Sequence, residues 1–193
     1  MTGKTRASAG GALLALMLAS ALTFAQTHGV PEEFTAIAIA NDEFRTGAGR
    51  VIIRVTRWST DGETERLVTA LQSKGSEALL DALKDARPVG TIRTPDSLAY
   101  DLRYAHQTKG EDGGRRIVIA TDRPISFWEA ANNARTLDYP FAVIQMQIGA
   151  NGEGKGTLSY ATRIRAYGKV IELENFSTAP IMLSEIKARP LAE

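Results

Sequence analysis

The feature that most constrains this chain is an alternation of apolar and polar residues with a period of two, which recurs along most of its length. This is the repeat of a β-strand that buries one face and exposes the other. Glycine-containing turns at 151–154 and 167–169 separate such runs, and turns of this kind join antiparallel neighbours. Strands are predicted at 34–40, 49–59, 89–94, 98–106, 115–121, 141–148, 156–166, 169–176 and 180–188. The chain is therefore predicted to be mainly β, a single antiparallel β-barrel or sandwich of about eight to nine strands.

One insertion, at residues 60–86, breaks the alternation. Thr60 and Glu63 have the spacing of a capping box, which opens a helix. That helix is expected to stop at Gly75, and Ser76 is expected to cap a second helix that ends before Pro88. Apolar residues at helical spacing give both helices an inner face: Leu67, Val68, Leu71, Leu79, Leu80 and Leu83. The insertion is therefore predicted to be an αα-hairpin packed over one end of the sheet, and a shorter helical turn is expected at 125–132.

Residues 1–25 have the pattern of a cleaved signal peptide. Lys4 and Arg6 precede an apolar run at 11–22, which is too short to cross a membrane, and small residues follow it. Cleavage is expected after Ala25 or, alternatively, after Ala21. The remaining residues, 26–193, are predicted to form a single β-rich domain that contains no transmembrane segment and resides in the periplasm or outside the cell.

Charge and composition narrow the function classes. Loss of Lys4 and Arg6 with the signal peptide changes the formal net charge from +1 to −1, so nothing in the charge balance indicates nucleic-acid binding. The chain has no cysteine and only two histidines, which argues against thiol chemistry and against a two-histidine metal centre. We predict no metal ion and no cofactor.

Arginine and aromatic residues at strand ends form the candidate ligand site. Guanidinium groups gathered at one rim would bind a carboxylate or phosphate head group, while aromatic rings would line an apolar cavity. A surface network of ion pairs would give the same sequence pattern. The candidate residues are Arg54, Trp58, Arg93, Tyr100, Tyr104, Arg123 and Trp128.

Two further features have simple structural explanations. His106 ends the face formed by Tyr100 and Tyr104, where lone histidines are mostly surface residues. Glu172 and Glu174 share a strand face at a spacing compatible with a glycosidase pair. The turn at 168–169, however, would place arginines opposite both glutamates, as cross-strand pairs Arg165–Glu172 and Arg163–Glu174. No catalytic residue is therefore predicted.

Three stretches resemble those of an uncharacterised group of secreted bacterial proteins: IRVTRWSTDG at 53–62, DGGRRIVIATDRP at 112–124 and IELENF at 171–176. The resemblance implies a secreted bacterial protein and carries no activity or catalytic residues with it.

The sequence leaves three functions open. The first is a non-enzymatic binding protein for a small amphipathic or anionic ligand, held inside the sheet or beneath the helical cap. The alternative is a protein-interaction module of the cell envelope, which would present an apolar surface patch. The third is a carboxylate-based hydrolase, which would require a buried carboxyl group with a strongly shifted pKa.

Overall fold

The structure is a computed structural model, which describes residues 29–42, 45–110, 113–125, 138–168, 170–176 and 179–191. The expected signal peptide lies outside the described residues. So does most of the helical turn expected at 125–132, including Trp128.

The described chain contains strands and one helical element. They are β1 (Glu32–Asp42), β2 (Arg45–Val55), α1 (Asp61–Lys84), β3 (Gly90–Arg93), β4 (Tyr100–Leu102), β5 (Tyr104–Lys109), β6 (Arg115–Thr121), β7 (Phe141–Ile148), β8 (Glu153–Tyr167), β9 (Val170–Asn175) and β10 (Ile181–Pro190). All strand pairs are antiparallel. The prediction of a mainly β fold is confirmed.

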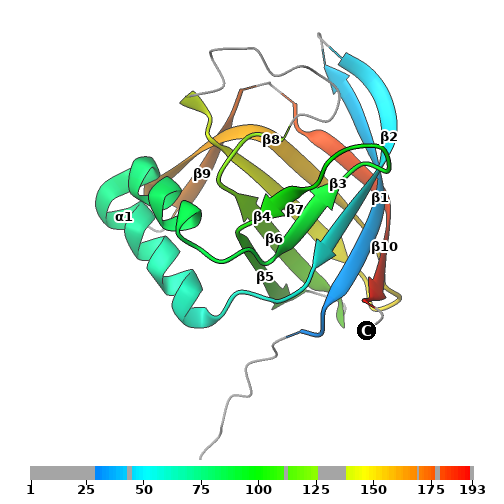
Figure 1. Ribbon diagram of the computed structural model, residues 1–193, viewed down its shortest axis with the longest axis horizontal. Coiled ribbons are helices and arrows are strands. Elements are labelled where there is room, and N and C mark those ends of the chain that lie inside the picture. Colours follow the sequence, from blue (N-terminus) through cyan, green and yellow to red (C-terminus); the bar gives the residue numbers. More distant parts are fainter. Residues whose placement is uncertain are drawn as a thin grey trace, which may run out of the picture.

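The strands follow the order β4-β3-β2-β1-β10-β8-β7-β6-β5, and β9 pairs with β8 outside this path. The two end strands, β4 and β5, are consecutive in the chain and are separated only by Arg103. The backbone amide of Arg103 donates to the carbonyl of Ala120 on β6, over 3.0 Å. The nine strands of the path therefore form a nearly closed barrel, which Figure 1 shows from one side.

The barrel interior is filled by the apolar residues of the alternating pattern. One face of each strand of the path contributes to a single buried cluster, with Trp58 and Val89 from the adjoining loops. Its largest fully buried side chains are Phe34, Ile53, Ile92, Leu102, Ile117, Ile119, Ile144, Met146, Ile148 and Leu158. We call this cluster the interior core.

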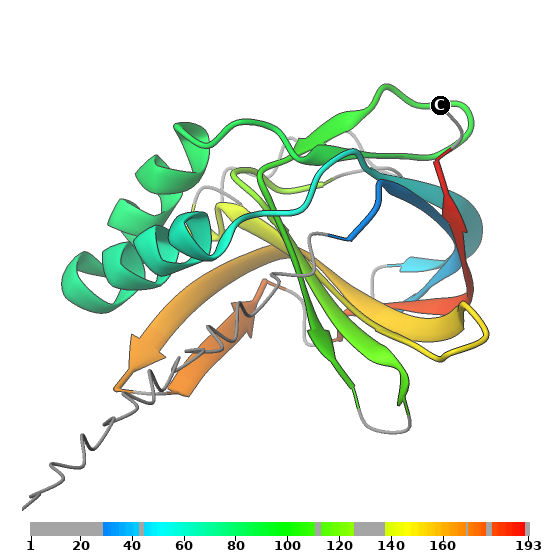
Figure 2. The same ribbon diagram turned by 90° about the horizontal axis from the view of Figure 1, so that it is seen from below.

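Helix α1 begins with the capping box expected from the sequence, formed by Thr60 and Glu63. At Gly75 the backbone leaves the helical region, with φ 79° and ψ −163°, a conformation that glycine adopts without steric cost. Two helical arms meet there, and both extend to the same side of the barrel (Figure 2). The Ser76 hydroxyl donates to the carbonyl of Ile164 on β8, over 2.8 Å, and so attaches the elbow to the sheet.

The two arms cover part of the outer face of the barrel. Their buried leucines pack against outward-facing residues of β6, β7 and β8. This second cluster, which we call the outer layer, contains Leu67, Leu71, Leu79, Leu83, Ala120, Phe141, Val143 and Ile164. In β7 both faces are therefore buried from Phe141 to Ile144, one by the interior core and the other by α1.

The largest differences between the observed and the expected element boundaries lie at two places. The strand expected at 49–59 begins earlier, at Arg45, and ends at Val55. The strand expected at 98–106 is divided at Arg103 into β4 and β5, which raises the number of strands to ten. No helix within the described ranges has the length and apolar character that crossing a membrane requires.

Candidate functional site

Of the predicted site residues, the arginines lie on the outer face of the barrel or in an exposed turn. Arg54 and Arg93 lie on the outer face of β2 and β3, where Arg54 pairs with Glu33 (2.7 Å) and Arg93 donates to the carbonyl of Pro95 (3.2 Å). Arg123 is exposed in the turn after β6. Arg54 and Arg93 thus make surface interactions on neighbouring strands.

Trp58 lies beyond the end of β2 and therefore does not belong to a strand face. Its side chain is buried in the interior core, and its indole Nε1 donates to the carbonyl of Val30 over 3.0 Å. The indole closes the barrel at the end where β1 begins. This contact assigns Trp58 a packing role.

Tyr100 and Tyr104 point to opposite sides of the barrel wall. Alternation from 98 to 106 would have placed them on one face, but the break at Arg103 shifts the alternation by one residue. Leu102 and Ala105 both face the interior core as a result. Tyr100 packs against the interior core, whereas Tyr104 packs against the outer layer beneath α1.

An apolar groove of about 360 Å³ lies between α1 and the outer face of the sheet. The arms of α1 form one wall and the outer faces of β5, β6 and β7 form the floor. The β8–β9 ribbon, which diverges from α1 in Figure 2, supplies Ile164, Ile171 and Leu173 as the second wall. The remaining lining residues are Thr64, Leu67, Val68, Leu71, Leu79, Leu83, Tyr104, His106, Val118, Ala120, Val143 and Gln145.

The groove contains a few polar groups among its apolar side chains. The Thr64 hydroxyl donates to the phenol oxygen of Tyr104 (3.4 Å), whose ring stacks on that of His106 with centroids 6.2 Å apart. Burial raises the pKa of Tyr104 above its ordinary value and the nearby Asp61 carboxylate adds to the rise, against the opposing effect of the Thr64 hydrogen bond. The phenol is therefore a neutral donor at physiological pH.

The strand register arranges the outer face in rows that cross β5, β6, β7 and β8. The first row, Tyr104, Ala120 and Val143, lies beneath α1. The second row is His106, Val118, Gln145 and Thr157, and the third is Thr108, Arg116, Gln147 and Lys155. Successive rows are two residues, or about 7 Å, apart. The outer face thus changes from apolar to cationic along the direction of the strands.

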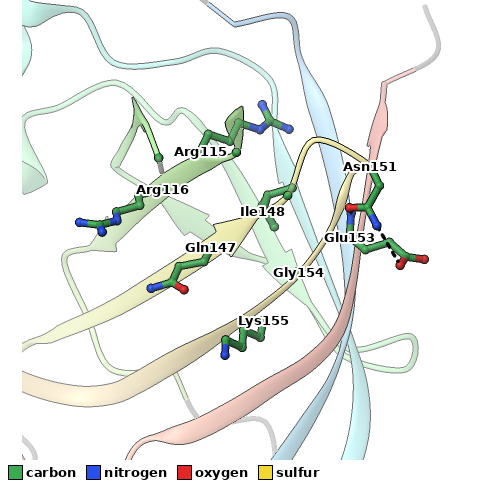
Figure 3. A pocket seen from close by; sticks show the side chains of 11 residues that line it. Arg115, Arg116, Gln147, Ile148, Asn151, Glu153, Gly154 and Lys155 are labelled. Carbon is green, nitrogen blue, oxygen red and sulfur yellow. Dashed lines mark hydrogen bonds between the residues drawn. The ribbon is translucent and has the colours of Figure 1, made fainter. Parts of the chain in front are cut away.

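Three residues of the third row, Arg116, Gln147 and Lys155, line a polar hollow of about 510 Å³ at the ends of β6, β7 and β8. Figure 3 shows the side chains of Arg116, Gln147 and Lys155 on one side of the sheet, with Arg115 and Ile148 on the other. Glu153 lies one row further along, beside the hairpin, and accepts a hydrogen bond from Asn151 (3.2 Å). The hollow and the apolar groove therefore occupy adjacent rows of the same face.

A buried ion pair closes the barrel near the indole of Trp58. Arg115 forms two short hydrogen bonds to the Glu32 carboxylate, of 2.6 and 2.7 Å, and a third to Gln107 of 2.9 Å. Because Glu32 is on β1 and Arg115 is on β6, the pair crosses the barrel end. Such a bidentate pair satisfies both charges and fixes the separation of the two strands.

The acidic residues considered for catalysis are engaged with arginines. The predicted register is confirmed, with Arg163 opposite Glu174 and Arg165 opposite Glu172, and the ion pair runs diagonally from Arg165 to Glu174 at 2.9 Å. The Arg57 guanidinium lowers the pKa of Glu63. In the part of the chain that the structure describes, no group of three potential metal-ligating side chains comes together.

Sequence reasoning included Tyr104 of the groove floor but missed most of its other residues and those of the hollow. The signal was present in part, since Val118, Gln145 and Arg116 occupy the less apolar faces of predicted strands, whereas Lys155 precedes the strand predicted at 156–166. Which of them are neighbours depends on the register between β6, β7 and β8, which the alternation alone does not specify.

Comparison of the chain with protein-family models, with curated proteins and with solved structures finds no match. The resemblance noted in the sequence therefore stays a prediction.

Proposed function

We propose that this protein binds a small amphiphile with a single hydrocarbon chain, and that the chain occupies the groove between α1 and the sheet. The observation that carries the proposal is the groove itself. Leucines of α1, the outer face of the barrel and the β8–β9 ribbon enclose it on three sides. Its volume of about 360 Å³ is within the range of small-molecule sites, which are mostly apolar with a few polar groups.

The energetics suit a hydrocarbon chain. Burial of a methylene group contributes about 0.8 kcal/mol, so a chain of about ten carbons would gain about 8 kcal/mol before the costs of association. The Tyr104 phenol, a neutral donor, would orient the ligand without requiring a buried charge.

Glu63, the described carboxyl group whose pKa shift is resolved, does not support the carboxylate-based hydrolase. A general acid requires a raised pKa, whereas the ion pair with Arg57 lowers that of Glu63. The carboxylate-based hydrolase therefore has less support than a binding protein.

A protein-interaction module is the second candidate, and the observation in its favour is the tip of the β8–β9 ribbon. Tyr167, Val170 and Ile171 are each more than half exposed there. Exposed apolar side chains grouped on one ribbon are a common feature of protein contact surfaces. This candidate predicts that a partner protein, and no small amphiphile, protects the ribbon.

We further propose that the protein acts in the periplasm or outside the cell. The support is the pattern of residues 1–25, in which two basic residues precede a short apolar run and small residues. The intact mass of the exported protein would distinguish cleavage after Ala25 from cleavage after Ala21.

The groove is tested with decanol and decanoate, measured by native mass spectrometry and titration calorimetry on the chain without residues 1–25. Val118 is 39% exposed on the groove floor, so Val118→Trp should fill the groove and weaken both ligands at least tenfold. Met182→Trp is the matched control, since Met182 is 51% exposed on β10 and does not line the groove. Equal binding by both variants, with unfolding temperatures unchanged, would show that the groove is not the site.

A further inference from the structure

We infer that the groove binds its ligand in one direction, with an uncharged oxygen at Tyr104 and the end of the hydrocarbon chain at the elbow of α1, near Gly75. The ligand class is thus a straight-chain alcohol or a similar neutral amphiphile, and the elbow limits the length of chain that fits. This inference rests on the proposed function, because it orients the same ligand in the same groove.

The first arm of α1 gives the groove two different ends. Near the start of the arm, Thr64 contacts Tyr104 on β5. At the elbow, the hydroxyl of Ser76 donates to the carbonyl of Ile164 on β8. Strands β5 and β8 are the outer members of the row β8-β7-β6-β5, so the arm crosses the whole row. The groove beneath the arm therefore extends across the sheet from β5 to β8.

The end of the groove at β5 offers a hydrogen-bond donor. The Thr64 hydroxyl has a single proton, and it lies closer to the carbonyl of Thr60 (3.0 Å) than to the phenol oxygen of Tyr104 (3.4 Å). Its proton is therefore engaged within the helix, and the Tyr104 phenol is the donor that this pair presents to a ligand. An oxygen atom of the ligand would accept that hydrogen bond.

The surroundings of the Tyr104 phenol favour an uncharged partner. Tyr104 packs against the outer layer, and burial raises its pKa, with a further contribution from the Asp61 carboxylate. Both effects oppose a negative charge beside the phenol oxygen, and a carboxylate bound there would experience them as well. A hydroxyl oxygen accepts the hydrogen bond without the cost of burying a charge.

The end of the groove at the elbow is apolar and closed. Leu71 and Leu79 lie four residues before and after Gly75, and both are buried and line the groove together with Ile164. The hydrogen bond of 2.8 Å from Ser76 to the Ile164 carbonyl leaves no space for a ligand to pass between the elbow and β8. A hydrocarbon chain suits this end, because a polar group would lose its hydrogen bonds to water there.

The separation of the two ends limits the chain. Thr64 and Leu71 both line the groove on the first arm, and the helical rise places them roughly 10 Å apart along its axis. While a growing chain is still being buried, each added methylene group should raise the affinity about fourfold. Once the chain reaches the elbow, further methylene groups stay in water and the increase should stop.

The direction of binding is tested by crystallography of the wild-type chain without residues 1–25, with 10-bromodecanol bound. Anomalous scattering locates the bromine atom, which marks the end of the chain away from the hydroxyl. The bromine should lie against Leu71, Leu79 and Ile164. A bromine atom beside Tyr104, or divided between the two ends, would overturn the inference.

The length limit is tested with the same truncation at the two ends of the groove. Leu79→Ala enlarges the elbow end and should raise the affinity for dodecanol relative to decanol at least threefold. Leu67→Ala is the matched control, since Leu67 lines the groove one turn after Thr64 and is buried to the same degree. It should leave the ratio of the two affinities unchanged. Equal changes in the ratio would mean that the elbow does not limit the chain.

The polar end is tested with Tyr104→Phe, which keeps the ring and removes the donor. This variant should weaken decanol about fivefold, the effect of one neutral hydrogen bond. Tyr167→Phe is the matched control, because Tyr167 is more than half exposed and does not line the groove. Titration calorimetry of wild-type protein should also show decanol binding more tightly than decanoate. Tighter binding of decanoate would overturn the assignment of an uncharged oxygen.

The two proposals fail in different ways. If decanol binds and Val118→Trp abolishes its binding, but the bromine atom lies at Tyr104, the direction is wrong and the groove stands. If no alcohol binds, both proposals are wrong. The bromine position is measured on wild-type protein, so it decides the direction even if a leucine variant does not fold.

Discussion

The interior core and the outer layer are built from the same kinds of side chain. The side chains of the interior core, however, are more completely enclosed than those of the outer layer. Ile117, Ile119 and Leu158 of the interior core are fully buried, because strands surround them on all sides. The leucines of the outer layer are covered by two helical arms that leave a groove of about 360 Å³ beside them. The barrel interior is thus closely packed, whereas the layer outside it leaves open the groove in which we propose that a ligand binds.

The largest expected effect comes from matched leucine truncations in the two regions. Leu158→Ala should cost about 3–5 kcal/mol of unfolding free energy, because a closed interior cannot collapse around the cavity that the change creates. Leu71→Ala should cost about 2 kcal/mol, since Leu71 already borders open space. Urea unfolding of both variants measures the difference. Equal costs would contradict the view that the two regions are packed to different degrees.

The next largest expected loss of unfolding free energy comes from the ion pair between Glu32 and Arg115 at the barrel end. Glu32→Ala would leave Arg115 without its carboxylate partner in a mostly buried setting, at an expected cost of about 3 kcal/mol. Glu33→Ala is the control on the same strand, because Glu33 pairs with the half-exposed Arg54 and should cost less than about 1 kcal/mol. Thermal unfolding of both variants tests this, and similar losses would argue against a special role for the pair across the barrel end.

The smallest expected loss of unfolding free energy is at the start of α1, and this loss depends on pH. The pKa of Glu63 is lowered from 4.5 mainly by its hydrogen bond to Arg57. The charged form therefore stabilises the fold above pH 4.5, and this contribution is lost as pH falls through the lower pKa of the folded state. Glu63→Gln should cost about 0.5 kcal/mol at pH 7 and nothing at a pH below that lowered pKa.

Hydrogen exchange locates the Glu63 effect. Amides in the first arm of α1 should exchange faster in Glu63→Gln at pH 7, while amides of β6 and β7 should not change, because the barrel does not depend on the arm. Glu65→Gln, an exposed neighbour on the same helix, serves as the control. A cost that stays constant across the pH range would mean that the charge of Glu63 is not its source.

The sequence predicted the elements of this fold well, because their signals are local. Alternation located β7 at its observed ends, and Thr60 with Glu63 located the start of α1. The Gly168 turn also gave the register of β8 and β9, since a short turn fixes which residues face each other. The sequence could not distinguish a barrel from a sandwich, because closure of the barrel depends on pairing between strands that are distant in sequence.

The candidate site could not be predicted in the same way. The break at Arg103 shifts the alternation by one residue, so Tyr104 and His106 contact the outer layer and not the interior that Tyr100 contacts. Val55 ends β2 three residues before Trp58, which removes that residue from the predicted strand face. Both changes are backbone irregularities that hydrophobic pattern alone does not specify, and together they place the groove outside the barrel.

The pairing of β1 with β10 has a consequence for how the molecule is made. The first and last strands are neighbours, with Glu32 opposite Pro190 and Ile39 opposite Met182. A ribosome delivers β1 before β10, so the ring stays open until β10 has emerged. Until then β1 and β8 each present an unpaired edge, which is the kind of edge at which chains join one another. A chain that ended before Ile181 would keep both edges open and would be expected to aggregate.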